Sequence, residues 1–151
     1  MSEPVGQALF DHSPWVEARA DAAASSGDRH ADLMAIVYAA SPDEQLALIR
    51  AHPELAGKAA IDRTLTDASA AEQASAGLDR LTPEEFAQFH ALNATYRERF
   101  GFPFIICVRL TDKAGILAAM QRRIANDRDT EIATALAQIS EIVRLRLGEA
   151  A

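Results

Sequence analysis

The chain has few of the features that mark several common classes of protein. It has one cysteine, Cys107, among its 151 residues, so it can form no internal disulfide and offers no cysteine pair for a zinc or iron–sulfur site. No apolar run is long enough to span a membrane, and residues 1–10 lack the basic and apolar regions of a secretory signal. We therefore expect a cytoplasmic protein with no membrane partner.

Basic residues are also in short supply. The chain carries 15 Lys and Arg against 22 Asp and Glu, which gives a net charge of -7. A nucleic-acid binder needs a basic face to neutralise phosphates, so we expect no nucleic-acid partner. A small anionic substrate remains compatible with this charge, because one local arginine can outweigh a diffuse negative surface.

The composition that remains is that of a helical globular protein. Apolar residues make up 49% of the chain, and there are only 7 Gly and 6 Pro. Alanine is abundant and β-branched residues seldom occur in runs, which favours helices over strands. The sequence therefore predicts one all-α domain over residues 1–151, a bundle of about seven or more helices.

Capping patterns predict the helix boundaries. Helices are expected to begin at Ser13-Pro14, near His30, at Ser41-Pro42, Ser69, Thr82-Pro83, Thr111 or Asp112, and Asp129. Gly101 and Gly148 are expected to end the helices before them, because glycine readily adopts the left-handed conformation. The helix after Thr82-Pro83 carries one apolar line, and Asn93 within it is expected to be buried and hydrogen-bonded. The apolar line consists of Phe86, Phe89, Tyr96 and Phe100.

The most apolar stretch runs from Phe102 to Leu110. Its composition allows a β-strand, but Pro103 removes a ladder donor and no second strand is available to pair with it. We predict a buried extended segment that leads into the next helix. Cys107 within it is expected to act as a small hydrophobe rather than a catalytic thiol, because no helix start or basic partner adjoins it.

His52 is the first candidate for chemistry. It follows Ile49 by three residues and Leu48 by four, so it shares the apolar side of their helix. Pro53 disfavours helical geometry at the residue before it, so the helix should end near His52. A helix C-terminus favours the protonated imidazole, which suits a proton donor. The same position also suits a structural histidine that caps its own helix. His12 and His30 lie in polar surroundings and are expected to be solvated.

Four other polar residues are candidates for substrate contacts. Ser69, Glu72 and Gln73 lie on one helical face, although a capping box would also explain the first two. Arg109 follows the buried segment, where a cation either meets an anion or extends to water. An arginine fork can hold an anion and a histidine can move a proton. The set therefore suits cofactor-free proton transfer on a small polar anion.

An ordered series of motifs covers nearly the whole chain from Ser13-Pro14-Trp15 onward. The later motifs are His52-Pro53-Glu54-Leu55 with Gly57-Lys58, Ser69-Ala70-Ala71-Glu72-Gln73, Gly77-Leu78, Leu81-Thr82, Asn93-Ala94-Thr95-Tyr96, Phe100-Gly101-Phe102-Pro103-Phe104-Ile105 and Arg144-Leu145-Arg146-Leu147. This series resembles the 2-oxo-4-hydroxy-4-carboxy-5-ureidoimidazoline (OHCU) decarboxylases, which catalyse the last step from urate to (S)-allantoin. The resemblance implies an all-α bundle, often a homodimer, with a small anionic substrate, no cofactor and no metal.

The resemblance also implies roles for individual residues. His52 would be the catalytic acid/base, and Glu72 would orient it and keep it cationic. The implied substrate-binding residues are Pro53, Ser69, Gln73, Phe104, Ile106 and Arg109. The chain departs from the family pattern at Arg19-Ala20-Asp21, where an Arg-Pro-Phe-like element is usual, and at Ala56, where glycine is common.

Two alternatives remain open from the sequence. In the first, the chain is a helical interaction module in which His52, Glu72 and Arg109 form a buried structural network. In the second, it is a hydrolase whose metal is held by His52, His90 and Glu72. The interaction module predicts that Gln73 can be replaced without loss of function, unlike in the decarboxylase. The hydrolase predicts that the purified protein contains metal.

Overall fold

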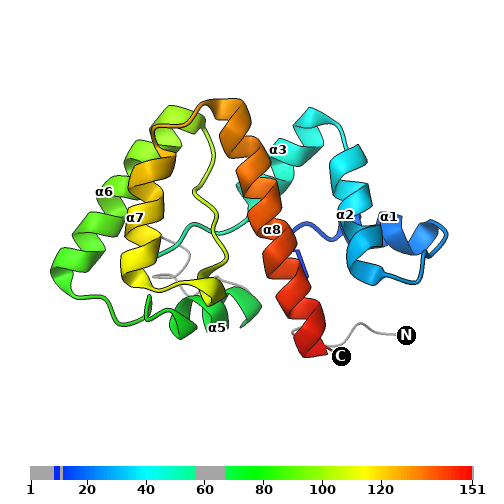
Figure 1. Ribbon diagram of the computed structural model, residues 1–151, viewed down its shortest axis with the longest axis horizontal. Coiled ribbons are helices and arrows are strands. Elements are labelled where there is room, and N and C mark those ends of the chain that lie inside the picture. Colours follow the sequence, from blue (N-terminus) through cyan, green and yellow to red (C-terminus); the bar gives the residue numbers. More distant parts are fainter. Residues whose placement is uncertain (1–8, 11, 57–66, 151) are drawn as a thin grey trace.

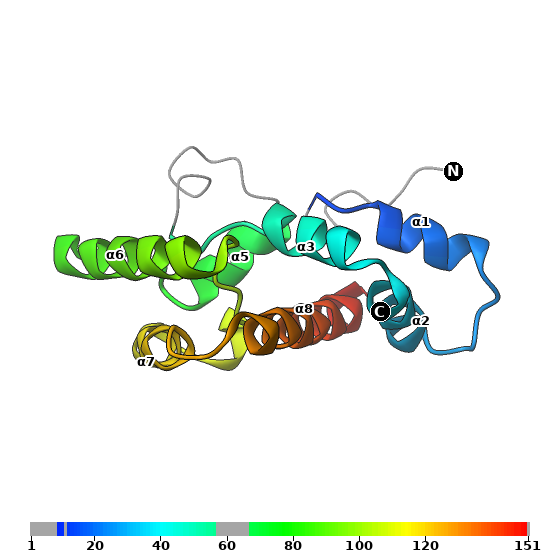
Figure 2. The same ribbon diagram turned by 90° about the horizontal axis from the view of Figure 1, so that it is seen from above.

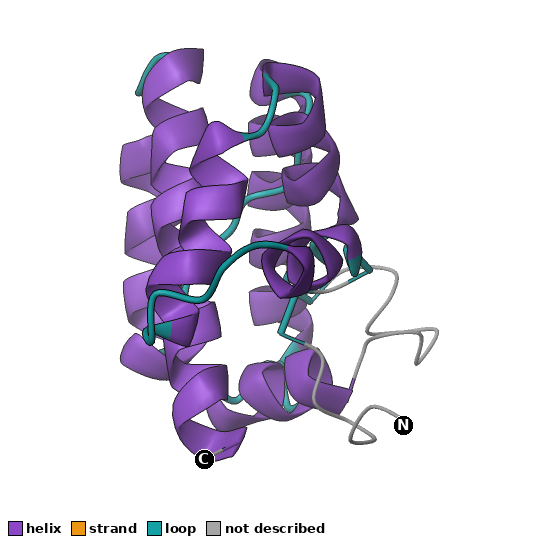
Figure 3. Cartoon of the chain, turned by 90° about the vertical axis from the view of Figure 1, so that its right-hand side faces the viewer, coloured by secondary structure: helices purple, strands orange, loops and turns teal. Residues whose placement is uncertain are grey.

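The computed structural model describes residues 9–10, 12–56 and 67–150, and within these ranges every regular element is a helix (Figure 3). The elements are α1 (Trp15–Ala22), α2 (Arg29–Ala39), α3 (Pro42–Ala51), α5 (Asp67–Ser75), α6 (Pro83–Phe100), the 3₁₀ turn η1 (Val108–Leu110), α7 (Lys113–Arg123) and α8 (Arg128–Ala150). The prediction of an all-α fold is confirmed. The motif Gly57-Lys58 and the loop predicted around it lie outside the described residues. Among the described helices, none has the length and apolarity needed to cross a membrane.

The helices form two layers. One layer contains α6, α3 and α1, and the other contains α7, α8 and α2 (Figure 2). The long helix α8 runs through the middle of the molecule and packs against both α2 and α3, while α5 lies against η1 (Figure 1). Side chains that are fully buried fill the space between the layers. They include Val16, Leu33, Val37, Ile49, Phe89, Tyr96, Ile116, Met120, Ala135 and Val143.

The predicted caps form as expected at three helices. Ser41 Oγ accepts the Glu44 N–H at 3.1 Å, and the Glu44 carboxylate accepts the Ser41 N–H at 3.1 Å. Thr82 and Glu85 make the same reciprocal pair at the start of α6. At α7 the side chain of Asp112 accepts a backbone N–H of the first turn at 2.8 Å, which decides between the two predicted caps. These local hydrogen bonds satisfy N–H groups that the first helical turn leaves without partners.

Three predicted boundaries are wrong. Helix α1 begins at Trp15 with no side-chain cap, because Ser13 is two residues away and Pro14 already has helical angles. Helix α5 begins at Asp67, so Ser69 lies inside the helix and the capping-box explanation for it fails. Helix α8 continues through Gly148, because a glycine inside a helix costs only about 1 kcal/mol and does not by itself end it.

The burial of two residues also differs from the prediction. His30 is half-buried, and its Nε2 lies 3.0 Å from the Ser140 carbonyl oxygen and 3.1 Å from its hydroxyl. The expectation of a solvated His30 is wrong because α2 packs directly on α8. Phe86, the first residue of the predicted apolar line, is exposed and stacks on His90. His12 is exposed, as expected.

The predicted buried extended segment, Phe102 to Leu110, is extended and mostly buried only as far as Cys107. The prediction is wrong for its last three residues, because Val108–Leu110 form the 3₁₀ turn η1 and Leu110 is exposed. Helix α6 ends at Gly101, which has the expected left-handed angle of φ 81°. The segment then passes beside α8 and enters η1 (Figure 1). Since it pairs with no strand among the described residues, its backbone is held by side chains from the surrounding helices, and it brings Arg109 alongside α5.

Candidate active site

A small pocket lies where the end of α3, helix α5, the extended segment and α8 meet. It encloses about 290 Å³, including its open mouth. The five polar residues selected from the sequence all line it, together with the predicted Pro53 and Ile106. The full lining is His52, Pro53, Leu55, Ser69, Glu72, Gln73, Ile106, Cys107, Val108, Arg109 and Ile142. Four separate parts of the chain therefore converge on one small space.

His52 reaches the pocket because α3 stops there. Its backbone is extended, with φ -72° and ψ 131°, as the following Pro53 requires. Its own N–H still donates to the Ile49 carbonyl at 3.2 Å, so it is the C-terminal cap of the helix. The predicted helix end is confirmed, and the side chain is half-buried in the pocket wall. A cation at this position would be favoured by the free carbonyl groups of the last turn.

The loop after His52 is fixed by helix α6. The Asn93 side-chain amide donates to the Leu55 carbonyl at 2.8 Å, and Arg97 forms an ion pair with Glu54. Asn93 is buried and hydrogen-bonded, as the sequence predicted. Asn93, a polar residue on the apolar side of α6, thus holds the backbone of Leu55, which lines the pocket.

Gln73 holds the same loop from the other side. Its Oε1 accepts the Ala56 N–H at 3.0 Å in a buried hydrogen bond. Because a backbone N–H can only donate, this bond identifies the oxygen of the Gln73 amide. The Nε2 group is then the donor that Gln73 can offer to a ligand. Gln73 therefore has a structural contact as well as a place in the pocket.

Ala56 has a backbone conformation that is unfavourable for alanine. Its φ is 51°, in the left-handed region, where the Cβ atom crowds the following carbonyl. It is the position at which the sequence departs from the glycine common in the resembling family. We expect Ala56→Gly to raise the free energy of unfolding by about 0.5–1 kcal/mol, because relief of strain exceeds the added entropy of the unfolded chain. Urea unfolding measures this change.

The matched control for that prediction is Ala91→Gly. Ala91 is exposed within α6, where a glycine should lower the free energy of unfolding by about 1 kcal/mol. Equal destabilisation by the two substitutions would contradict the presence of strain at Ala56.

Arg146 on α8 is the important residue that sequence reasoning missed. Its Nε and Nη2 bind the two carboxylate oxygens of Glu72 at 2.9 and 2.7 Å, and both side chains are buried. It also donates to Ser69 Oγ at 3.3 Å and to the Leu9 carbonyl at 3.1 Å. The sequence does contain a signal that Arg146 faces inward, because it follows the apolar Val143 by three residues on the inner face of α8. The pocket wall formed by α5 is thus anchored to α8.

The charges around the pocket suit an anionic ligand. The carboxylate of Glu72 is already balanced by the bidentate Arg146. Arg109 is exposed at the mouth, where it also lines an adjoining space with Glu72. With a protonated His52, the positive charges at this site would exceed the negative ones, although the whole chain is acidic.

The side chains of Phe104 and His90 do not line the pocket, and Cys107 behaves as expected. Phe104 is fully buried and packs against Tyr96 and the Arg123 guanidinium, which lies 4.3 Å from its ring centroid, so its side chain does not line the pocket. His90 is exposed on α6 and is not among the pocket residues. In the described part of the chain, no group of His, Cys, Asp and Glu is arranged to hold a metal ion. Burial raises the pKa of the Cys107 thiol, as suits a small hydrophobe.

Comparison with known proteins identifies the family. The family model described as OHCU decarboxylase matches residues 4–148. The OHCU decarboxylase of Haloferax volcanii is 44% identical over 145 residues, which are 93% of this chain and 83% of that protein. The chain belongs to the OHCU decarboxylase family. This membership confirms the resemblance seen in the sequence and assigns the chain to the carboxy-lyases rather than to interaction modules.

Two further comparisons extend the result. The uric acid degradation bifunctional protein of Bacillus subtilis is 40% identical over 144 residues, covering 93% of this chain and 28% of that protein. This supports the predicted place of the family in urate degradation. A crystal structure of an OHCU decarboxylase in the presence of (S)-allantoin covers 94% of each chain with a TM-score of 0.72. Its sequence identity is 19%, so it shows that the fold is shared.

Proposed function

We propose that this pocket decarboxylates OHCU to (S)-allantoin and that His52 is the acid/base. The observation that supports the proposal is the convergence of five polar side chains on one pocket from three parts of the chain. They are His52, Ser69, Glu72, Gln73 and Arg109. They offer an imidazole, a hydroxyl, a carboxylate, an amide and a guanidinium. These groups can bind an anion and transfer a proton, which is what the reaction requires without a cofactor.

The chemistry follows from the substrate. One ring carbon of OHCU carries both a carboxylate and a hydroxyl, and the neighbouring ring carbon is joined to nitrogen by a double bond. When the bond to the carboxylate breaks, its electron pair forms a double bond between the two ring carbons, and the nitrogen takes up a proton. The hydroxyl then loses its proton to become a carbonyl, while the neighbouring carbon is protonated. The net reaction consumes one proton and releases carbon dioxide.

Stereochemistry requires that the carbon be protonated on one face only. In the proposal His52 delivers this proton, because it enters the pocket from a fixed helix end. Glu72, held rigidly by Arg146, supplies a fixed negative charge that orients and stabilises the imidazolium. Fixed groups of this kind need no reorganisation as charge moves during the reaction.

The remaining pocket residues would bind the substrate. Arg109 at the mouth would hold the negative charge of the carboxylate or of the ring oxygen. The Gln73 Nε2 group would donate to a carbonyl oxygen, because its own oxygen is engaged with Ala56. Ser69 and the backbone of Ile106 would bind the amide groups of the ring and of the ureido tail. Pro53 would shape the wall beside them.

The test is the circular dichroism of urate treated with uricase and its hydrolase partner, with and without this protein. Spontaneous decay gives racemic allantoin, which leaves no lasting signal. We expect the protein to produce a strong and persistent signal of one sign. A trace that matches the protein-free control would overturn the proposed reaction.

The resemblance also supports an expected setting for the enzyme. We propose that residues 1–151 form a single domain that works as a homodimer in the cytoplasm. Light scattering should then give twice the mass of one chain, and cell fractionation should recover the protein with cytoplasmic enzymes. A monomeric mass at assay concentration would refute the dimer.

A further inference from the structure

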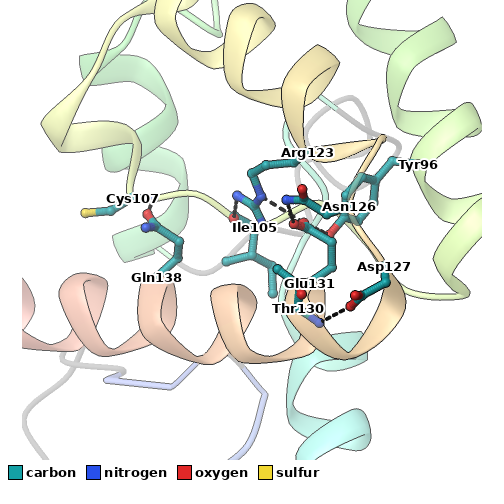
Figure 4. Close-up of polar contacts among 9 residues, drawn as sticks. All are labelled: Tyr96, Ile105, Cys107, Arg123, Asn126, Asp127, Thr130, Glu131 and Gln138. Carbon is teal, nitrogen blue, oxygen red and sulfur yellow. Dashed lines mark hydrogen bonds and ion pairs between the residues drawn. The ribbon is translucent and has the colours of Figure 1, made fainter.

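Two side chains from different helices fix the backbone on either side of Ile106. Arg123 at the end of α7 donates from Nη1 to the Ile105 carbonyl oxygen at 2.7 Å. Gln138 on α8 accepts the Cys107 N–H with its Oε1 at 2.8 Å. Figure 4 shows both contacts on the same short length of the extended segment. Ile106 itself lies between them and lines the pocket.

Peptide geometry then determines where the polar groups of Ile106 point. No peptide bond in the described residues is cis. In a trans peptide the carbonyl of one residue and the N–H of the next point in opposite directions. The Ile106 N–H must therefore point away from the Arg123 guanidinium, and the Ile106 carbonyl must point away from the Gln138 amide. Within the described residues, neither group of Ile106 is hydrogen-bonded to the protein.

The backbone N–H and carbonyl of Ile106 can both pair with a ligand that enters the pocket. Backbone polar groups away from water are normally paired, so a ligand that pairs with them gains affinity. A donor and an acceptor from one residue match the N–H and C=O groups of an amide or urea. The ring and the ureido tail of OHCU both carry such groups. The alternative partner is water, which binds both groups without selecting a substrate.

We propose that Gln138 and Arg123 are positioning residues that aim the N–H and carbonyl of Ile106 at an amide edge of the substrate. The inference deepens the proposed function and rests on it. Neither side chain is among the pocket residues, so each acts through the peptide group it holds. In the part of the chain that the structure describes, the segment has no neighbouring strand to fix its peptide planes, and these two hydrogen bonds take the place of a sheet.

Arg123 is itself held by a buried network (Figure 4). Its Nε donates to Glu131 Oε1 at 2.8 Å, and Tyr96 donates its hydroxyl to the same oxygen at 2.6 Å. Asn126 donates to the other carboxylate oxygen at 2.8 Å. Burial raises the pKa of the Tyr96 hydroxyl well above its usual value, so it stays a donor. A cation fixed in this way holds the Ile105 carbonyl rigidly, but its replacement would also break a buried ion pair.

Gln138 is therefore the residue to change, because it is only half-buried and is not part of that ion pair. Gln138→Leu removes the acceptor of the Cys107 N–H at similar size, whereas Gln138→Glu keeps an acceptor. We expect Gln138→Leu to raise KM for OHCU by about three- to tenfold, the effect of one hydrogen bond, with kcat changed by less than about twofold. An amide edge that takes no part in bond breaking is bound equally in the ground state and the transition state, so its loss appears in KM.

The controls separate positioning from general stability. Gln138→Glu should restore KM to near the value of the unchanged enzyme. Gln45→Leu is the control variant, since half-buried Gln45 also makes a side-chain to backbone hydrogen bond, in which its Nε2 donates to the Val37 carbonyl at 3.0 Å and links α3 to α2. It should lower the unfolding temperature without raising KM. Thermal unfolding of each variant shows whether it is folded under assay conditions.

Each result has a defined meaning. A higher KM in Gln138→Leu, with recovery in Gln138→Glu and none of this effect in Gln45→Leu, supports the proposal. Turnover of OHCU with the same KM in all variants overturns the positioning role and leaves the proposed function intact. An equal rise of KM in Gln138→Leu and Gln45→Leu also overturns it. An unchanged enzyme that does not convert OHCU overturns the proposed function and the inference together. If Gln138→Leu does not fold, the KM of Gln138→Glu decides the question. A KM equal to that of the unchanged enzyme supports the role of the Gln138 acceptor, and an elevated KM in the folded variant overturns it.

Discussion

His52→Ala is expected to lower kcat for OHCU by about 10²- to 10⁴-fold, which is the usual value of general acid–base help. The imidazole is the group in the pocket best suited to move a proton near neutral pH. The helix should survive, because the capping contact that His52 makes to Ile49 uses its backbone N–H, which alanine retains. Initial rates in the circular dichroism assay and far-ultraviolet spectra measure the two effects separately.

His90→Ala provides the matched control. His90 is exposed on α6 and is not among the pocket residues, so this variant should keep the rate of the unchanged enzyme. A His52→Ala enzyme with full activity would refute the acid/base assignment. Loss of helical signal in His52→Ala would instead show that the residue is a structural cap, which is the alternative that the sequence left open.

Local sequence signals predicted the parts of the fold that depend on neighbouring residues. Ser41 and Glu44 are three residues apart, and their capping box forms as the pattern indicates. Pro53 ends α3 at His52 through steric contact with the adjacent residue. The five polar residues singled out from the sequence also lie together, since all of them line one pocket.

Contacts between distant parts of the chain could not be predicted in the same way. Arg146 pairs with Glu72 across 74 positions, and His30 meets Ser140 across 110. The spacing of Arg146 after Val143 indicates that it faces inward, but no pattern in a single sequence shows which residue either side chain meets. The sequence therefore suggested a role for Glu72 but gave no indication of the cation that balances it. Such partners depend on how helices pack, and packing is decided by the whole core.

Arg146→Met should lower the free energy of unfolding by about 3–5 kcal/mol, a larger loss of stability than any of the other substitutions should cause. The change removes the bidentate partner of Glu72 and leaves a carboxylate that is only 11% exposed without that compensation. It also releases Ser69 and the Leu9 carbonyl from the same guanidinium. Urea unfolding followed by circular dichroism measures the loss.

Arg144→Met is the control on the same helix. Arg144 is exposed and pairs with Glu141 in the adjacent turn at 2.8 Å, an arrangement worth at most about 0.5 kcal/mol. Similar stability of the Arg144 and Arg146 variants would contradict the view that the buried pair anchors α5 to α8.

The double variant Glu72→Gln with Arg146→Met separates the structural role of this pair from its role in catalysis. Removing both charges leaves no buried carboxylate to compensate, so the double variant should recover part of the stability lost in Arg146→Met. It should not recover activity, because the fixed negative charge proposed to orient His52 is gone. A double variant that regains both stability and turnover would show that Glu72 serves only the fold. Recovered stability with low kcat would show that α8, through Arg146, holds a catalytic charge in place.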